Sequence, residues 1–217
     1  MIYKAVIFDF DYTLGDATDA IFAGFNHAFT TMGLPVPDRE AVRHTVGMLV
    51  VDAYTILSGD ESQAGRDRFY SLFHPVARDL QAQGVVELCP GARELLAALK
   101  ERGIPTAVVS TKNTDSLRAV FASKDLTDAF THVVGGDLVS KPKPDPEGID
   151  WVLGQLGLTA GEVLYCGDTV IDAQAAQNAG ADFCAVLNGT TPAEAFEPYL
   201  HKHIAPDLFN LKAWLEL

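Results

Sequence analysis

The sequence predicts an α/β protein in which a Rossmann-like parallel sheet forms the core and an all-helical domain is inserted into it. Short apolar runs rich in β-branched residues recur along the chain, and stretches of helical periodicity lie between them. Such runs are typical of parallel strands buried on both faces, and their alternation with helices indicates a doubly wound sheet. One long segment near the N-terminus breaks the alternation, because helical patterns follow one another there without an intervening strand.

The expected strands are five apolar runs, with helical patterns in the intervals between them. Two of these helices should end at Gly103 and Gly157, because glycine readily adopts the left-handed conformation that closes a helix. The helix before Gly157 should begin at Asp145-Pro146, a capping residue followed by proline at the first helical position. The expected strands lie at residues 5–8, 106–110, 132–135, 162–166 and 183–187.

The helical insert should cover residues 16–85 as a cap domain, with residues 1–15 and 86–217 as the α/β core. The first helix of the insert carries a stripe of apolar side chains, which we interpret as core, and Pro75 should kink the last helix. An alternative is that these helices simply cover the sheet. The stripe consists of Ile21, Phe22, Phe25, Phe29 and Met32, and further helices are expected near 38–46, 50–58 and 61–83.

The composition limits the classes of partner. Apolar residues make up 48% of the 217 residues, which is enough to bury a core, and the net charge of −13 would repel nucleic acid and anionic membranes. No apolar run approaches the ~20 residues that span a bilayer, and the N-terminus does not resemble a signal peptide. Cys89, Cys166 and Cys184 are too widely spaced for a zinc site or a disulfide framework. We therefore expect a cytoplasmic protein without nucleic-acid or membrane partners. The sequence leaves open whether it is a monomer or a homodimer.

Polar side chains follow the ends of four expected strands. In an open α/β sheet, ligands bind beyond the carboxyl ends of the strands, so these side chains should meet at one edge. Several carboxylates there would repel one another unless a hard divalent cation held them together, and a lysine with hydroxyl groups beside such a metal forms a phosphate site. The residues are Asp9, Asp11 and Thr13, then Ser110, Thr111 and Lys112, then Lys141, and finally Asp168 and Asp172.

Taken in this order, the four motifs resemble those of the haloacid dehalogenase superfamily, and the resemblance covers essentially the whole chain. The helical insert directly after the first motif is similar to the C1-type cap of the phosphoglycolate phosphatase-like group, and Pro90-Gly91 also fits that group. The resemblance implies a Mg²⁺-dependent phosphatase that hydrolyses the phosphomonoester of a small metabolite. Phosphoglycolate is the substrate expected for the group, with pyrophosphate, sugar phosphates and nucleotides as alternatives.

The resemblance also implies a role for each motif residue. Asp9 would attack phosphorus and form an aspartyl-phosphate, while Asp11 would protonate the leaving oxygen and then activate water. The metal would be held by Asp9, the backbone carbonyl of Asp11 and Asp168, with Asp172 as a more distant or water-mediated partner. The phosphoryl group would be bound by Thr13, Ser110, Thr111 and Lys141. Thr13 would also support the loop around Asp11, and Lys141 would act in catalysis by neutralising the phosphate and the nucleophile Asp9.

Two assignments have direct alternatives. Lys143 also precedes a proline and competes with Lys141, although the offset to Asp145-Pro146 favours Lys141. Asp172 could be only a cap at the start of a helix.

Two positions differ from the usual pattern of the superfamily, and the cap offers candidates for substrate recognition. Tyr12 stands where glycine is usual and should narrow the pocket for the leaving group, and Thr111 stands where asparagine is common. The cap residues expected to recognise the substrate are His44, Thr45 and Gly47, although an ordinary helix C-terminus would explain them equally well.

Three other functions are weighed against phosphatase activity. Sugar phosphomutases of this fold carry a histidine on the first cap helix, roughly where Ile21 stands, and a dehalogenase would lack the second aspartate, Asp11. A phosphate-binding or regulatory module without turnover is the third alternative. The complete set of motif residues argues against it: Asp9, Asp11, Ser110, Lys141 and Asp168.

Overall fold

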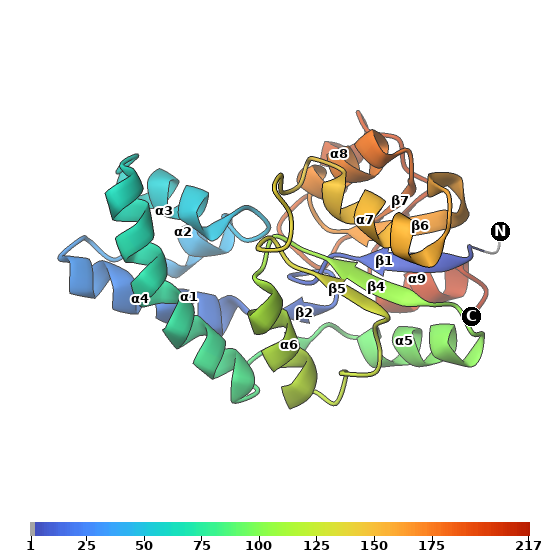
Figure 1. The fold of residues 1–217 in the computed structure, drawn as a ribbon, viewed down its shortest axis with the longest axis horizontal. Coiled ribbons are helices and arrows are strands. Elements are labelled where there is room, and N and C mark those ends of the chain that lie inside the picture. The colour runs from blue at the N-terminus through green and yellow to red at the C-terminus, as the bar shows by residue number, and fades with distance from the viewer. Residues whose placement is uncertain (1–2) are drawn as a thin grey trace.

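A parallel sheet of six strands forms the centre of the core (Figure 1). The computed structural model describes residues 3–217. The strand order is β5-β4-β1-β6-β7-β8, with all neighbours parallel. The bounds are β1 Ala5–Phe8, β4 Thr106–Val109, β5 His132–Val134, β6 Val163–Gly167, β7 Asp182–Val186 and β8 His203–Ala205. The five expected strands are confirmed to within one residue at each end, and β8 is an additional strand.

Helices cover both faces of this sheet, so the predicted α/β fold is confirmed. Alternate side chains of β1 point to opposite faces: Val6 and Phe8 join one apolar cluster, and Ala5 and Ile7 join the other. The first cluster is covered by α5 (Ala92–Glu101), α6 (Thr114–Ser123) and α9 (Leu208–Trp214). The second is covered by α7 (Glu147–Leu156), α8 (Val170–Ala179) and the 3-10 helix η2 (Ala193–Phe196), and a further 3-10 helix, η1 (Ala160–Glu162), precedes β6.

The three cysteines, Cys89, Cys166 and Cys184, are buried as free thiols. Burial raises the pKa of Cys89 to about 12, so this thiol stays protonated and acts as an apolar packing group. Within residues 3–217, no helix is both long enough and apolar enough to cross a membrane.

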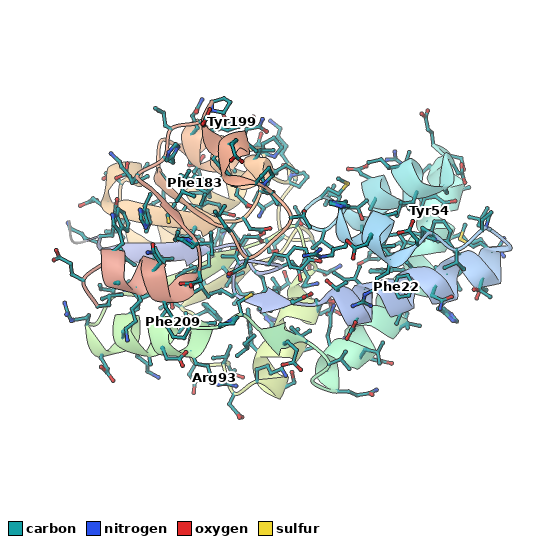
Figure 2. The ribbon with its side chains drawn as sticks, turned by 180° about the vertical axis from the view of Figure 1, so that it is seen from behind. Phe22, Tyr54, Arg93, Phe183, Tyr199 and Phe209 are labelled. Atoms are coloured by element: carbon teal, nitrogen blue, oxygen red, sulfur yellow. The ribbon has the colours of Figure 1, made fainter. Side chains whose placement is uncertain are left out.

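The segment between β1 and α5 folds into a group of helices beside the sheet, on the left of Figure 1 and on the right of Figure 2. This helical lobe contains α1 (Thr18–Met32), α2 (Arg39–Arg43), α3 (Val50–Ser58) and α4 (Gln63–Ala82). The last helix continues through Pro75. Two short antiparallel strands, β2 (Gly15–Asp16) and β3 (Glu87–Leu88), join the two ends of the lobe. These helices pack mainly on one another instead of covering a face of the sheet.

Aromatic side chains fill the centre of the helical lobe. The ring of Phe69 stacks on those of Tyr54 and Phe73, with centroids 4.7 Å and 5.4 Å apart. The centroid of Phe25 lies 5.0 Å from that of Phe69, and Phe25 and Phe29 are fully buried. The apolar stripe of the first helix is therefore core, as expected.

Helix α2 is shorter than the helix expected at 38–46. Asp38 caps its start, because the carboxylate accepts a hydrogen bond from the backbone N–H of Ala41 at 2.8 Å. The chain leaves the helix after Arg43, and Gly47 has a φ of +103°, a left-handed value that favours glycine. Residues 44–49 consequently form a turn between α2 and α3, and we call this segment the 44–49 turn.

Phe69→Ala should destabilise the protein by about 3–5 kcal/mol, because it leaves a cavity among stacked rings that cannot collapse fully. The control is Ile56→Ala in the same lobe, where the side chain is 64% exposed and the loss should be small. The free energy of unfolding of both variants is measured by urea denaturation. A similar loss in both variants would show that the aromatic cluster does not stabilise the lobe.

Candidate active site

Three adjacent strands deliver polar side chains to one edge of the sheet. β1 lies between β4 and β6, and Asp9, Ser110 and Asp168 each follow directly on the carboxyl end of one of these strands. The backbone N–H of Asp9 donates a hydrogen bond to the carbonyl of Cys166 at 2.8 Å. Because this bond continues the pairing of β1 with β6, it fixes the position of Asp9 beside β6.

Asp9, Asp168 and Asp172 form a buried cluster of carboxylates. The three residues are 1%, 2% and 0% exposed, and each offers a carboxylate oxygen within 4.8 Å of the others. Burial raises the pKa of Asp9 to about 6, although Lys143 opposes the rise. Burial, with the negative charges of Asp172 and Asp9, raises the pKa of Asp168 well above its usual range. The cluster thus carries more negative charge than its surroundings compensate.

The residues of this cluster suit a divalent cation. Their donor atoms are carboxylate oxygens, the donor type that hard cations prefer. A Cβ atom at Gly189 would lie 2.2 Å from Oδ2 of Asp168, so only glycine leaves room for that oxygen. Nearby, Oδ1 of Asp11 is buried without a hydrogen-bond partner. The donor set, the space beside Asp168 and the uncompensated charge all agree with a bound cation.

Asp172 differs from the other two acids because both of its oxygens are engaged. Oδ2 accepts hydrogen bonds from the backbone N–H and the hydroxyl of Thr169, at 3.0 Å and 2.7 Å, which forms a capping box at the start of α8. Oδ1 accepts from Lys143 at 2.6 Å and from the Tyr165 hydroxyl at 3.0 Å. Asp172 is therefore a helix cap, as one alternative expected, and it also holds Lys143 in place.

The lysine beside Asp9 is Lys143, and the prediction that placed Lys141 there is wrong. The side chain of Lys143 is 4% exposed, and its Nζ lies 3.0 Å from Oδ1 of Asp9. Burial alone would lower the pKa of Lys143, but the charges of Asp172 and Asp9 outweigh it and raise the pKa above its ordinary value. Lys143 is consequently a charged ammonium group inside the acidic cluster.

Lys141 points to solvent because its turn is held at the surface. Glu147 accepts hydrogen bonds from the backbone N–H groups of Ser140 and Lys141, both at 2.9 Å. The side chain of Lys141 is 73% exposed, and its Nζ lies 4.0 Å from a carboxylate oxygen of Asp145. The acids around the start of α7 thus hold Lys141 away from Asp9.

Asp11 is paired with Lys112, a residue to which the resemblance assigns no role. Nζ of Lys112 lies 3.0 Å from Oδ2 of Asp11, and the two side chains are 7% and 9% exposed. Lys112 follows β4, which is the neighbour of β1, so the two residues meet across adjacent strand ends. In the sequence, only the position of Lys112 shortly after an expected strand pointed to the site. Charged residues are too common in turns for that position to decide its role.

Thr13 and Ser110 contact the acids from two other directions. The hydroxyl of Thr13 donates a hydrogen bond to Oδ1 of Asp168 at 3.2 Å, and Thr13 is fully buried. The Ser110 hydroxyl opposes the rise in pKa that burial imposes on Asp9. Both residues therefore help to hold the acids in their charged form.

The backbone conformation at Tyr12 explains why glycine is usual at this position in the superfamily. Its φ is +56°, in the left-handed region that bulky residues rarely adopt. The hydroxyl of Tyr12 hydrogen-bonds with that of Thr18 at 2.5 Å, and the guanidinium of Arg43 lies 5.8 Å from the ring centroid. Tyr12 is not among the residues lining the cavity beside Asp11, so the expected narrowing of the leaving-group pocket is not found there.

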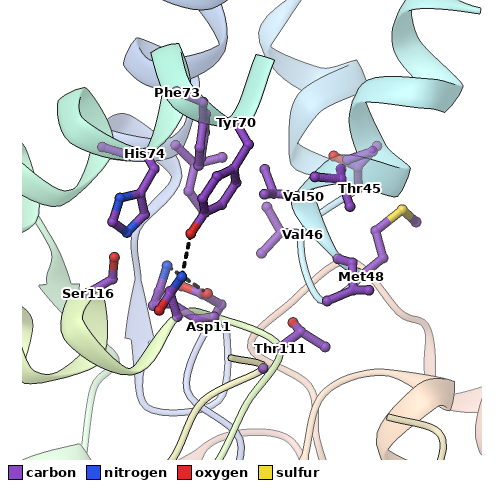
Figure 3. A pocket seen from close by; sticks show the side chains of 18 of the residues that line it. Asp11, Thr45, Val46, Met48, Val50, Tyr70, Phe73, His74, Thr111 and Ser116 are labelled. Atoms are coloured by element: carbon purple, nitrogen blue, oxygen red, sulfur yellow. Dashed lines mark hydrogen bonds and ion pairs between the residues drawn. The ribbon is translucent and has the colours of Figure 1, made fainter. Parts of the chain in front are cut away.

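A cavity of about 230 Å³ lies between Asp11 and the helical lobe (Figure 3). Two hydrogen bonds join core and lobe along its wall. The Thr111 hydroxyl donates to the carbonyl of Gly47 at 3.1 Å, and the Asn113 side chain donates to the hydroxyl of Tyr70. Because Asp11 borders the cavity, a molecule bound beside Asp11 has room to extend toward the helical lobe.

Two of the three cap residues expected to recognise the substrate line this cavity. Thr45 and Gly47 belong to its wall, and the Thr45 hydroxyl donates a hydrogen bond to the carbonyl of Val42 at 2.7 Å. His44 is exposed and lies outside the cavity wall, so the structure does not bring it beside Asp11. The reason is that α2 ends at Arg43 and the following turn directs other residues toward Asp11.

The family model for haloacid dehalogenase-like hydrolases matches residues 6–186, a range that includes the acidic cluster, Lys143 and the whole helical lobe. The chain belongs to this family.

This hydrolase resembles phosphatases of the family along most of its length. It is 32% identical over 202 residues to a phosphoglycolate phosphatase of Pectobacterium atrosepticum, covering 89% of this chain and 84% of that protein. It is 34% identical over 200 residues to a protein named "Probable phosphatase IndB" of Dickeya dadantii, with 89% and 86% covered. A solved structure named for a haloacid dehalogenase-like hydrolase of Bacteroides fragilis superimposes with a TM-score of 0.90 at 30% identity, covering 96% and 99% of the two chains. The chain is thus an enzyme of the phosphatase type within its family.

Lys143→Met should remove nearly all turnover of this hydrolase and destabilise it by about 3–5 kcal/mol, because it leaves buried Asp9 and Asp172 without a counter-charge. Lys141→Met is the matched control and should change neither property. Hydrolysis of p-nitrophenyl phosphate and urea denaturation measure the two effects. If Lys141→Met caused the larger loss of turnover, the assignment of Lys143 would be overturned.

Proposed function

We propose that this protein is a Mg²⁺-dependent phosphatase that hydrolyses small phosphomonoesters through an aspartyl-phosphate on Asp9. The observation that carries the proposal is the position of Asp9. Its carboxylate lies at the end of β1 with the ammonium group of Lys143 at 3.0 Å and two further carboxylates within 4.8 Å. A nucleophile, a fixed cation and a donor set for a metal are thus close enough to act on one phosphoryl group.

In the first step, an oxygen of Asp9 attacks phosphorus, and the bond between phosphorus and the leaving oxygen breaks. Asp11 supplies the proton to that oxygen, because it borders both the acidic cluster and the cavity for the leaving group. Lys143 neutralises the negative charge of Asp9 and of the phosphoryl oxygens. Ser110, at the end of β4, donates a hydrogen bond to the phosphoryl group. In the second step, Asp11 takes a proton from water as the water attacks phosphorus and releases Asp9.

The proposed ligands of Mg²⁺ are Asp9, Asp168 and the backbone carbonyl of Asp11. When bound, the ion would neutralise the negative charge shared by these acids and the phosphoryl group. Thr13 orients Asp168 through its hydrogen bond, and Asp172 fixes Lys143 rather than offering a free oxygen. Burial, and after it the charges of Asp172 and Asp9, raises the pKa of Asp168, and a bound cation would oppose that rise.

The helical lobe would act as a cap over the site, with domain limits near residues 16–85. It is closed against the core by the hydrogen bonds of Gly47 and Tyr70, and His74 lies 3.2 Å from Asp115 of α6. A closed cap excludes bulk water while the aspartyl-phosphate exists. Opening of these contacts would let the substrate enter and the alcohol leave.

The substrate is proposed to be a small phosphorylated metabolite handled in the cytoplasm, and phosphoglycolate is the reference substrate because relatives carry its name. Ile21, at the position where the resemblance to phosphomutases would require a histidine, lines the cavity with an apolar side chain. Without an acid–base group there, the residues favour hydrolysis over phosphoryl transfer between sugar hydroxyls.

The first test is hydrolysis of p-nitrophenyl phosphate with Mg²⁺, which should stop with EDTA and return when Mg²⁺ is added in excess. Asp9→Asn should lose turnover altogether and fold normally, because an amide cannot serve as the nucleophile. In the wild type, a quench in acid during turnover should trap ³²P from a labelled ester on the protein, and Asp9→Asn should trap none. Turnover that resisted EDTA, or persisted in Asp9→Asn, would refute the mechanism.

The second test separates Asp11 from Asp9. Asp11→Asn keeps the backbone carbonyl proposed as a metal ligand but cannot transfer a proton, a contribution typically worth ~10²–10⁴-fold in rate. We expect kcat to fall by that order while the affinity for Mg²⁺, measured by calorimetry, changes little. A fall of less than tenfold in kcat, measured with an alkyl phosphate whose leaving group needs protonation, would exclude Asp11 as the acid.

A further inference from the structure

The cavity beside Asp11 indicates what kind of alcohol this hydrolase releases. We propose that the leaving group of its substrate is an uncharged, largely apolar alcohol or phenol that donates a hydrogen bond to Gln81. The inference rests on the proposed function, because it concerns the part of the substrate beyond the phosphoryl group. It departs from glycolate, which carries a carboxylate and gives the relatives their name.

The part of the cavity wall that the helical lobe supplies is mostly apolar. Ile21 of α1, Val46 and Met48 of the 44–49 turn, Val50 of α3 and Phe73 of α4 all line it. Figure 3 shows Val46, Val50 and Phe73 on the lobe side of the cavity, with Asp11 on the core side. Contact with such a wall favours apolar groups over charged ones, because a charge loses its hydration there and gains no partner.

The charged side chains of the cavity wall offer no free positive charge. Among the residues that the structure describes, two aspartates and one lysine line the cavity, and no glutamate or arginine does: they are Asp11, Asp137 and Lys112. Lys112 is already paired with Asp11 at 3.0 Å, and Asp137 accepts hydrogen bonds from the N–H and hydroxyl of Thr114. The wall therefore has a net negative charge, which would repel a carboxylate or a second phosphate on the leaving group.

Arginines of the lobe do not compensate for this charge. Arg43 lies over the ring of Tyr12, and Nε of Arg78 lies 3.2 Å from a carboxylate oxygen of Asp115. Neither residue belongs to the cavity wall. His74 also lines the wall, but its Nε2 lies 3.2 Å from Oδ1 of Asp115. An anionic leaving group would thus find no unpaired cationic partner along the wall formed by the described residues.

Gln81 places a hydrogen-bond acceptor without a partner on the lobe side of the cavity, away from Asp11 on the core side. This residue of α4 lines the cavity, is 2% exposed, and its Oε1 is buried without a hydrogen-bond partner. A buried acceptor without a partner costs free energy, so a donor on the ligand would gain by meeting it. On the lobe side of the wall, the side chains of Thr45, Tyr70 and His74 are already hydrogen-bonded. The leaving group is therefore expected to carry one hydroxyl or N–H group among apolar atoms.

The experiment compares three esters of similar shape and leaving-group basicity: 4-methylphenyl, 4-(hydroxymethyl)phenyl and 4-carboxyphenyl phosphate, with phosphoglycolate as a fourth. We expect kcat/KM to be highest for the hydroxymethyl ester and next for the methyl ester. The carboxyphenyl ester and phosphoglycolate should be at least about tenfold poorer than the methyl ester, since their carboxylate would be buried unpaired. An equal or higher kcat/KM for either carboxylate ester would overturn the inference.

Gln81→Leu isolates the acceptor. The preference for the hydroxymethyl over the methyl ester should fall by about three- to tenfold, the range of one neutral hydrogen bond. The control is Gln83→Leu, two residues further along at an exposed position, which should keep the wild-type ratio. An unchanged ratio in Gln81→Leu would remove Gln81 from the proposal.

Met48→Lys tests the charge argument with a side chain of similar length. It should raise kcat/KM for the carboxyphenyl ester relative to the methyl ester by about tenfold or more, because the carboxylate gains a partner. Ile56→Lys places the same charge on an exposed part of the lobe and should leave the ratio unchanged. The same ratio in both lysine variants would contradict the charge argument.

Binding to Asp9→Asn, measured by calorimetry with Mg²⁺, distinguishes failure of this inference from failure of the proposed function. Tighter binding of the methyl and hydroxymethyl esters than of the carboxyphenyl ester would support the inference even if the wild type hydrolysed none of them. Hydrolysis of p-nitrophenyl phosphate together with preferred binding of the carboxyphenyl ester would leave the phosphatase function standing and overturn the inference alone.

Discussion

The ammonium group of Lys143 holds together a site that would otherwise be unstable. Three carboxylates are buried at one end of the sheet, and Lys143 contacts two of them. One of the two, Asp172, also caps α8, so a single contact links a helix start, the nucleophile and the loop before α7. Removing the charge would disturb all three at once. The residues that keep this part of the fold together are therefore the same residues that hold Asp9 in place for reaction.

The sheet and the acids at its edge were predictable because each leaves a local signal. Strands buried on both faces appear as continuous apolar runs, and aspartates such as Asp9 and Asp168 directly after such runs are unusual in a sequence. The strands β2 and β3 were not predictable, since two residues carry no periodicity. The strand β8 was missed because its three residues include only one β-branched side chain, whereas β5, of the same length, includes two. Their pairing is decided by neighbours that are distant in the chain.

The choice between Lys141 and Lys143 could not be made from the sequence, because each precedes a proline and their local contexts are alike. Contacts across the fold decide it: Asp172 and Tyr165 hold one lysine inside, and Glu147 holds the turn of the other at the surface. The pairing of Lys112 with Asp11 depends in the same way on the position of β4 beside β1. The exposure of His44 follows from where α2 ends, and helix ends are the least certain part of any sequence-based assignment.

Gly47 joins the helical lobe to the core through its own main-chain carbonyl group. Its carbonyl accepts the hydrogen bond of Thr111, while a Cβ atom at this position would lie 2.8 Å from the side chain of Thr169. The joint therefore requires glycine at this position. Val46 and Met48 line the cavity beside Asp11 but supply no atom to this hydrogen bond, so replacing either changes the shape of the cavity and keeps the bond between Thr111 and Gly47. Single substitutions in this one short turn can therefore change which leaving groups fit beside Asp11.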